Sequence, residues 1–167
     1  MRPSYAPAME IARLNHAVLF VTDIDRAVEF YTRVFGFEVV QRETRMNAAF
    51  LRSPKSGNHH DLGLFGLGDR ARPKMPGAVG LYHLAWQVPT IDDLASARNE
   101  LMAAGALGGE SSHGATLSLY GSDPDGNEFE IMWMLPRDAW GEYETKAVVE
   151  RLDLPAELER WTGVVTA

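Results

Sequence analysis

Two stretches of the chain decide the fold, LNHAVLFVTDIDRAVEF at residues 14–30 and LYHLAWQVPTIDDLASA at residues 81–97. When His16 is aligned on His83, an offset of 67 residues, the valine, isoleucine and aspartate that follow each histidine also match. Each copy opens with an apolar stretch of seven or eight residues, which is typical of a strand buried on both faces. The chain is therefore predicted to contain an internal repeat.

A helix is predicted after each of these strands. Thr22 and Thr90 each stand three residues before an aspartate, a pattern that satisfies the first free N–H groups of a helix. Gly36 and Gly105 are predicted to end the two helices, because glycine accepts a positive φ without steric cost. Shorter strands are predicted after the helices, at 37–44, 48–53, 60–67, 107–112, 115–121 and 127–135.

The predicted fold class is α+β, with two βαβββ modules that form an open, incompletely closed mixed barrel. The expected organisation is a first module, a linker containing Gly and Pro, a second module and a C-terminal extension within one compact domain. These parts are assigned to residues 11–67, 68–80, 81–135 and 136–167. A short helix is expected over 155–161.

Glu130 is the first candidate metal ligand. In the predicted strand 127–135 its side chain shares a face with Met132 and Met134, because side chains alternate. An ionised carboxylate among apolar groups costs several kcal/mol without a partner. No Lys or Arg lies on that strand, so another group must compensate the charge.

His16 and His83 are the other two candidates. A lone histidine in an apolar strand is more often a hydrogen-bonded core residue, but these two occupy equivalent positions of the repeat. Closure of the two modules would bring them together with Glu130 around the shared interior. Two imidazoles and one carboxylate with open positions favour non-haem iron(II) chemistry with oxygen. Fe(II) is the expected ion, and Mn(II) or another divalent metal is an alternative.

The repeat and its DPDGN-x-x-E ending, residues 123–130, resemble the vicinal oxygen chelate superfamily. That superfamily includes glyoxalase I, antibiotic-resistance binding proteins, epimerases and extradiol ring-cleaving dioxygenases. The resemblance covers residues 11–135 and is strongest to small catechol 2,3-dioxygenase-like, type I extradiol enzymes. It implies metal ligands on the first strand of each module and the last strand of the second, which are His16, His83 and Glu130 here.

The stretch HGATLSLYGSDPDGNEFE, residues 113–130, resembles the extradiol signature, and His59-His60-Asp61 is similar to the His-Asp motif of those enzymes. The resemblance implies that His60 acts as an acid–base group near bound oxygen. It implies that His113 and Tyr120 hydrogen-bond the substrate. Each residue also has a simpler interpretation: a turn for His60 or His113, and strand packing for Tyr120. His59 is expected to be a solvated neighbour.

Glyoxalase-type members add a fourth protein ligand from the fourth strand, but residues 62–65 read LGLF and offer none. This favours a metal-dependent extradiol dioxygenase that acts on a catechol-like aromatic diol with O2. Two alternatives stay open, a glyoxalase-like isomerase, lyase or epimerase, and a non-catalytic protein that binds an aromatic drug. Phe50, Trp86 and Trp133 are candidates to line the pocket.

The composition excludes several classes of partner. A net charge of −7 argues against nucleic acid, because phosphate binding needs clustered Lys and Arg. The chain has no cysteine, so disulfides and thiolate ligands are excluded. No apolar stretch approaches the ~20 residues that cross a bilayer, and no secretory h-region is visible. A cytoplasmic protein is expected, with a homodimer or higher homo-oligomer as the commonest assembly.

Overall fold

The computed structural model describes residues 9–75 and 77–166 and contains two modules of the same design. The first module has a four-stranded sheet in the order β1-β4-β3-β2, in which β1 and β4 are parallel and the other pairs antiparallel. Its elements are β1 (Ala17–Val21), α1 (Ile24–Phe35), β2 (Glu38–Glu43), β3 (Ala48–Arg52) and β4 (Leu62–Gly66).

The second module repeats this topology, with the sheet order β5-β8-β7-β6 and a parallel pair β5–β8. Its elements are β5 (His83–Gln87), α2 (Ile91–Ala103), β6 (Leu107–Ser112), β7 (Thr116–Ser122) and β8 (Glu128–Met134). The register shifts between Val39 and Gln41 in β2, and between Leu107 and Gly109 in β6, so even this irregularity is repeated. The α+β fold class and the two open βαβββ modules are therefore confirmed.

The starts of the two helices differ in chemistry. Thr90 and Asp93 form the expected capping box of α2, in which each side chain accepts from the other's backbone N–H. The cap of α1 is Asp23, whose carboxylate accepts from the N–H groups of Asp25 and Arg26. The prediction that Thr22 starts this helix was wrong, because the adjacent aspartate reaches those donors. Gly36 ends α1 at φ 66°, as expected.

The prediction that the first strand of each module is buried on both faces was wrong. In β1, Leu19 and Val21 are buried under α1, whereas Val18 and Phe20 are 52% and 68% exposed. In β5, Ala85 and Gln87 are exposed in the same alternation. Each strand is the edge of its sheet and is covered by helix on one face only, so apolar residues extend onto the open face.

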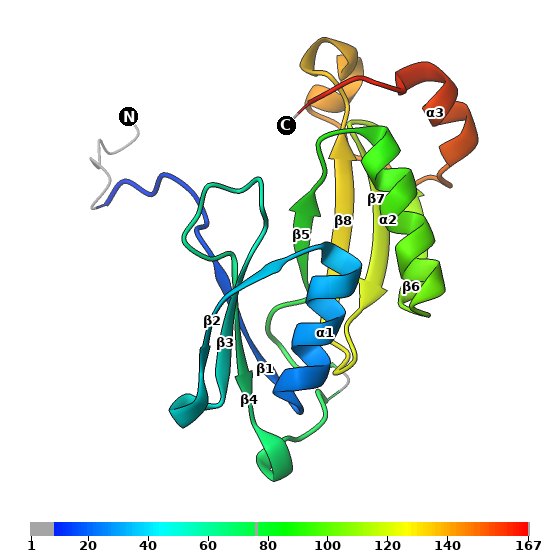
Figure 1. Cartoon of the computed structure of the whole chain (residues 1–167). Helices are drawn as coiled ribbons and strands as arrows, with labels where there is room; N and C mark the ends of the chain where they lie inside the picture. The colour runs from blue at the N-terminus through cyan, green and yellow to red at the C-terminus, as the bar shows by residue number, and fades with distance from the viewer. Residues whose placement is uncertain (1–8, 76, 167) are drawn as a thin grey trace, which may run out of the picture.

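Aromatic side chains join the modules beneath α1, which lies at the junction of the two sheets in Figure 1. Phe35, at the end of α1, contacts Phe129 of β8 with a ring-centroid distance of 4.9 Å. Phe37 packs against Trp86 of β5 at 5.3 Å. These contacts belong to a buried core that continues across the junction and bring the edge strands β1 and β5 toward each other.

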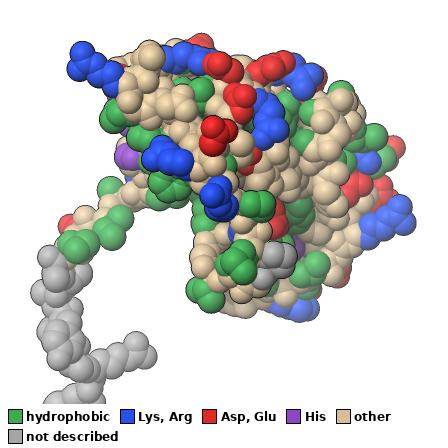
Figure 2. Space-filling view, turned by 90° about the horizontal axis from the view of Figure 1, so that it is seen from below, with side chains coloured by type: hydrophobic (Ala, Val, Ile, Leu, Met, Phe, Trp, Pro, Cys, Tyr) green, Lys and Arg blue, Asp and Glu red, His purple; other side chains and the backbone are tan. Residues whose placement is uncertain are grey.

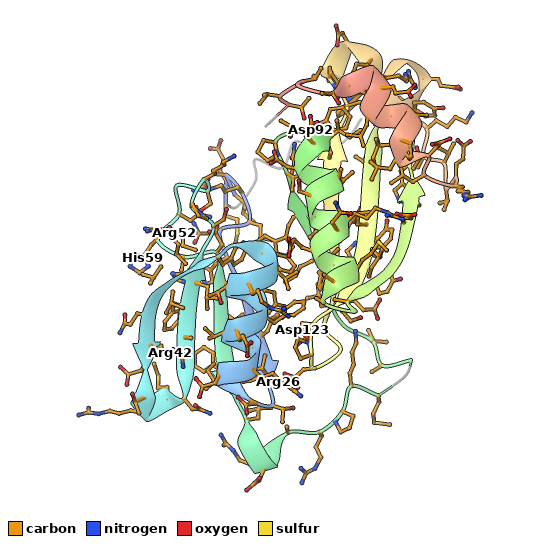
Figure 3. The ribbon with its side chains drawn as sticks, turned by 45° about the vertical axis from the view of Figure 1, so that its right-hand side comes forward. Arg26, Arg42, Arg52, His59, Asp92 and Asp123 are labelled. Atoms are coloured by element: carbon orange, nitrogen blue, oxygen red, sulfur yellow. The ribbon has the colours of Figure 1, made fainter. Side chains whose placement is uncertain are left out.

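A turn of the second module is bonded to α1 of the first. The Tyr31 hydroxyl donates to Asp123 Oδ2 at 3.1 Å in a buried contact. Asp125 accepts from Arg26 at 2.7 Å and from the Thr22 N–H at 3.0 Å. Figure 3 shows Arg26 and Asp123 close together at this junction. The DPDGN turn therefore fixes the orientation of one module on the other, in addition to reversing the chain.

The C-terminal extension folds back onto the second module. Its helix α3 (Leu154–Trp161) matches the predicted helix and packs against α2, with Trp161 against Trp133 at 6.1 Å. Asp92 accepts from the Gly163 N–H at 2.9 Å, at the start of α2 (Figure 3).

In the part of the chain that is described, no helix is long and apolar enough to span a bilayer. Basic and acidic side chains are mixed on the face in Figure 2.

Tyr31→Phe is expected to lower the free energy of unfolding by about 1–3 kcal/mol, because it removes a buried hydrogen bond to a charged group. Chemical denaturation of both proteins measures this difference. Tyr82→Phe is the matched control, since Tyr82 is 67% exposed and its loss should change stability by less than about 0.5 kcal/mol. Equal stability of Tyr31→Phe and wild type would contradict the role of this bond.

Candidate metal centre and its surroundings

His83 and Glu130 meet on the open face of the second sheet. His83 is the first residue of β5, and Glu130 lies on the parallel neighbour β8 opposite Ala85. Their side chains approach to 3.1 Å between Nε2 and Oε2 and are 26% and 13% exposed. The alternation of β8 turns Phe129, Ile131 and Trp133 toward the helices and leaves Glu130 on the other face. The predicted face of Glu130 is thus the observed one.

His16 lies directly before β1 and belongs to the other module. Its side chain is exposed, and its Nδ1 is 2.9 Å from Asn15 Oδ1. His16 and His83 line the same cavity of about 490 Å³, together with Trp86. Among residues 9–75 and 77–166 no three His, Cys, Asp or Glu side chains are close enough to hold an ion. The structure thus joins His83 to Glu130 and places His16 across a shared cavity, and the full triad stays a prediction.

His60 stands beside His16, at a ring-centroid distance of 4.5 Å. Phe50 packs edge-on against it at 5.2 Å, and His59 Nδ1 is 3.0 Å from its Nδ1. Partial burial lowers the pKa of His60, and the neighbouring His16 and His59 lower it further. The His60 imidazole is therefore held in its neutral form near pH 7, where it can accept a proton.

Asp61 was not identified from the sequence as a site residue beyond its place in the His-Asp motif. Its buried carboxylate accepts from the Ser53 N–H at 2.8 Å, from Ser56 Oγ at 2.7 Å and from Asn58 Nδ2 at 2.7 Å. Asn58 also donates to the Asn15 carbonyl at 2.9 Å. These bonds fix the loop before β4 against the residue that precedes His16, so Asp61 helps to hold His16 and His60 next to each other.

His113 and Tyr120 lie with Glu130 on the second module. His113 Nε2 is 2.7 Å from the Tyr120 hydroxyl, which is 3.4 Å from Glu130 Oε1. Ser111 Oγ also approaches His113 Nε2, at 2.9 Å. Burial raises the pKa of Tyr120, and the Glu130 charge adds to the shift, so the phenol stays protonated. The structure therefore brings His113, Tyr120 and Glu130 into one series of close polar contacts, which continues from Glu130 to His83.

The six predicted site residues form two walls. His16 and His60 are on the first module, whereas His83, Glu130, Tyr120 and His113 are on the second. Among the predicted pocket residues, Trp86 lines the cavity and Phe50 packs on His60. Trp133 is fully buried on the helix side of its sheet, so its assignment to the pocket was wrong.

Gly63 is the structural counterpart of Glu130. Val18 pairs with Gly63 in the first sheet, and the repeat-equivalent Ala85 pairs with Glu130 in the second. A Cβ at Gly63 would lie 3.3 Å from Val18 Cγ2 and 3.6 Å from Phe50. The first module therefore offers no side chain where the second offers a carboxylate, as the sequence spacing indicates.

The residues on the second wall fit a divalent ion. Imidazole nitrogen and carboxylate oxygen are ligands that Fe(II), Mn(II) and related ions accept. The buried Nδ1 of His83 has no hydrogen-bond partner among the described residues. Nε2 faces Glu130 Oε2 at 3.1 Å, so Nε2 is the nitrogen that could bind an ion beside this carboxylate. The Glu130 carboxylate is largely buried, and no Lys or Arg is bonded to it in the described part of the chain. A cation between the two would compensate its charge.

Comparison with known proteins identifies the family to which this chain belongs. Residues 13–131 match the model of the Glyoxalase/Bleomycin resistance protein/Dioxygenase superfamily, and the chain belongs to that superfamily. It is 36% identical over 121 residues to biphenyl-2,3-diol 1,2-dioxygenase 3 of Rhodococcus globerulus, covering 71% of this chain and 62% of that protein. The first curated relatives are longer, so the chain spans less than two thirds of their length.

Two further similarities bear on the metal and the fold. The chain is 30% identical over 96 residues to the manganese-dependent 2,3-dihydroxybiphenyl 1,2-dioxygenase of Geobacillus genomosp. 3, covering 58% of this chain and 27% of that protein. The structure of a glyoxalase/dioxygenase from Nostoc punctiforme superposes with a TM-score of 0.61 at 20% identity, over 81% of this chain and 99% of that one. The second similarity concerns the fold alone.

Removal of the Glu130 carboxylate is expected to lower affinity for Fe(II) or Mn(II) by more than about a hundredfold, beyond the 10–100-fold typical of a residue that only orients a ligand. Anaerobic titration calorimetry and metal analysis of Glu130→Ala and His83→Ala measure this. Glu29→Ala, which removes an exposed carboxylate on α1, is the control and should bind as wild type does. Unchanged affinity in both site variants would refute the site.

Proposed function

We propose that the protein is a metal-dependent extradiol dioxygenase that cleaves a catechol-like aromatic diol with O2. The observation that carries this proposal is the chain from His83 through Glu130 and Tyr120 to His113, which places a phenol and an imidazole beside two metal-ligating side chains. The names of the relatives support it, since both are dioxygenases of aromatic diols. The ion would be held by His83, Glu130 and His16.

A bound Fe(II) or Mn(II) supplies Lewis acidity that lowers the pKa of the diol, and open positions beside the protein ligands. Iron is the ion we propose, and the manganese-dependent relative supports manganese as a substitute. Gly63, which leaves the position equivalent to Glu130 without a ligand, supports a site with more open positions than that of a four-ligand isomerase.

Tyr120 and His113 would take the first proton from a hydroxyl group of the diol. His113 Nε2 lies 2.7 Å from the Tyr120 oxygen, whereas Glu130 Oε1 lies 3.4 Å from it. The closer contact would take the single Tyr120 hydrogen and leave the lone pairs of the oxygen free to accept. When a diol hydroxyl gives its proton to the Tyr120 oxygen, the Tyr120 hydrogen passes to His113 Nε2. One O–H bond breaks and one forms at Tyr120, and the imidazole becomes imidazolium.

His60 would act as the acid–base group on the opposite wall, which belongs to the first module. Its neutral imidazole stands beside His16, so it can take up a proton from the substrate and return it at a later step. Phe50 lies directly behind it, and Phe65 continues the aromatic surface at 6.2 Å from Phe50. This surface would exclude water and contact the ring of an aromatic substrate.

The homo-oligomer expected from the sequence also stays a proposal. The exposed apolar side chains of Val18 and Phe20 on the open face of β1 support it, because contiguous exposed apolar surface is typical of an interface. The molar mass of the purified protein by light scattering tests it directly.

Oxygen uptake after anaerobic loading with Fe(II) tests the proposed activity, with a panel of simple and substituted catechols. We expect uptake together with a visible-absorbing ring-opened product, and neither in Glu130→Ala. Absence of uptake from protein shown to hold iron would contradict the dioxygenase proposal for that panel. Conversion of a substrate without oxygen would instead indicate isomerase, lyase or epimerase chemistry. Binding of aromatic drugs by protein that holds no divalent metal would indicate a resistance protein.

Tyr120→Phe is expected to lower kcat by about a hundredfold, the size typical of a lost proton-transfer group, with metal content unchanged. His60→Ala should have a similar effect for the same reason. Glu29→Ala, which removes an exposed carboxylate on α1, is the control and should stay within about threefold of wild type. Equal losses in Glu29→Ala and His60→Ala would rule out a specific role for His60.

A further inference from the structure

The C-terminal extension adds a strand-like contact to the free edge of the second sheet. Glu150 and Ser112 exchange both backbone hydrogen bonds, each at 2.9 Å, in an isolated antiparallel bridge. Ser112 is the last residue of β6, the outer strand of its sheet. Figure 1 shows the extension passing over this end of the sheet before it turns into α3. The bridge therefore brings residues 148–150 against the segment that carries His113.

His113 is bonded directly to this extension. Its Nδ1 lies 2.8 Å from the Val148 carbonyl oxygen. A carbonyl only accepts, so Nδ1 must carry the hydrogen, and in the neutral ring Nε2 is left as the acceptor. Nε2 is the atom that faces the Tyr120 hydroxyl at 2.7 Å and Ser111 Oγ at 2.9 Å. One backbone carbonyl thus decides which nitrogen can accept a proton from Tyr120.

The residue after His113 is also covered by the extension. Gly114 has φ +82°, and a Cβ there would lie 2.3 Å from Cδ1 of Tyr143. The Tyr143 ring therefore rests on the backbone of Gly114, and only glycine allows that approach. His113 is held by the extension at its ring, through Val148, and at the next backbone unit, through Tyr143.

Contacts on both sides fix the extension itself. Before this segment, the Trp140 indole N–H donates to the Leu135 carbonyl at 2.8 Å. After it, α3 packs on α2, and Val165 bridges Thr90. The segment 141–150 is thus held between two anchors on the second module, so the position of the Val148 carbonyl is set by the fold.

We propose that the C-terminal extension is a positioning element of the site: the Val148 carbonyl holds His113 as the Nδ1–H tautomer and so makes Nε2 the acceptor for the Tyr120 proton. Its catalytic consequence rests on the proposed function, whereas the tautomer does not. Val148 and Tyr143 act through His113 and need not touch the substrate.

The test compares Glu150→Pro with Glu150→Ala. Proline removes the N–H that donates to Ser112, whereas alanine removes only the side chain and keeps the bridge. Long-range ¹H–¹⁵N correlation of the imidazole rings in metal-free protein reports the tautomer, at a pH well above the ordinary histidine value of about 6.5. The His113 signals are assigned by their loss in His113→Gln.

Wild type and Glu150→Ala are expected to show His113 protonated at Nδ1 alone. Glu150→Pro should show a mixture of both tautomers, and kcat should fall about tenfold with metal content and KM unchanged. Tyr143→Ala should shift the tautomer in the same direction, and it is the deciding variant if circular dichroism shows that Glu150→Pro does not fold.

A wild-type His113 protonated at Nε2, or an unchanged tautomer in both folded variants, would overturn the proposal. A shifted tautomer with unaltered kcat would overturn its catalytic part. If no oxygen uptake is found in any form but the tautomer shifts as expected, the positioning by Val148 stands and the dioxygenase proposal fails. The two proposals can therefore fail separately.

Discussion

The orientation of the two modules depends on a pair of carboxylates in one turn. Asp123 accepts from the buried Tyr31 hydroxyl, and Asp125 accepts from Arg26 and from the backbone just before α1. All three bonds join the second module to the first. Since His16 and His83 reach their common cavity from different modules, the relative orientation of the modules sets the distance between the two histidines. The turn that precedes the Glu130 strand therefore also fixes the far wall of the site.

Strand β8 has two chemically different faces, and this difference allows the fold to hold a carboxylate in the site. One face buries Phe129, Ile131 and Trp133 in the core, which stabilises the strand by roughly 1.5–3 kcal/mol for each large apolar side chain. The other face holds Glu130, whose burial is unfavourable without a charged partner. The apolar face thus provides the energy that keeps a carboxylate in a site where a cation, His83 and Tyr120 can compensate it.

Much of this could be predicted from the sequence, because the repeat shows which strands, helices and histidines of the two modules are equivalent. The offset of 67 residues correctly matched Gly63 with Glu130, and side-chain alternation correctly placed Glu130 on its face. The exposure of Val18 and Phe20 was not predictable, because a continuous apolar sequence is compatible with a strand covered on one face or on both. The contact of Val148 with His113 could not be predicted from the sequence, because it is made by a backbone carbonyl that every residue carries.

The proposed metal centre requires that both modules contribute ligands to one ion. A crystal structure of the protein loaded with Mn(II), grown without oxygen, tests this most directly. It should show one ion bound by His16, His83 and Glu130, with Tyr120 still bonded to His113 and the cavity between the modules narrowed. An ion held by His83 and Glu130 with His16 turned away, or an ion at His16 and His60 instead, would contradict it.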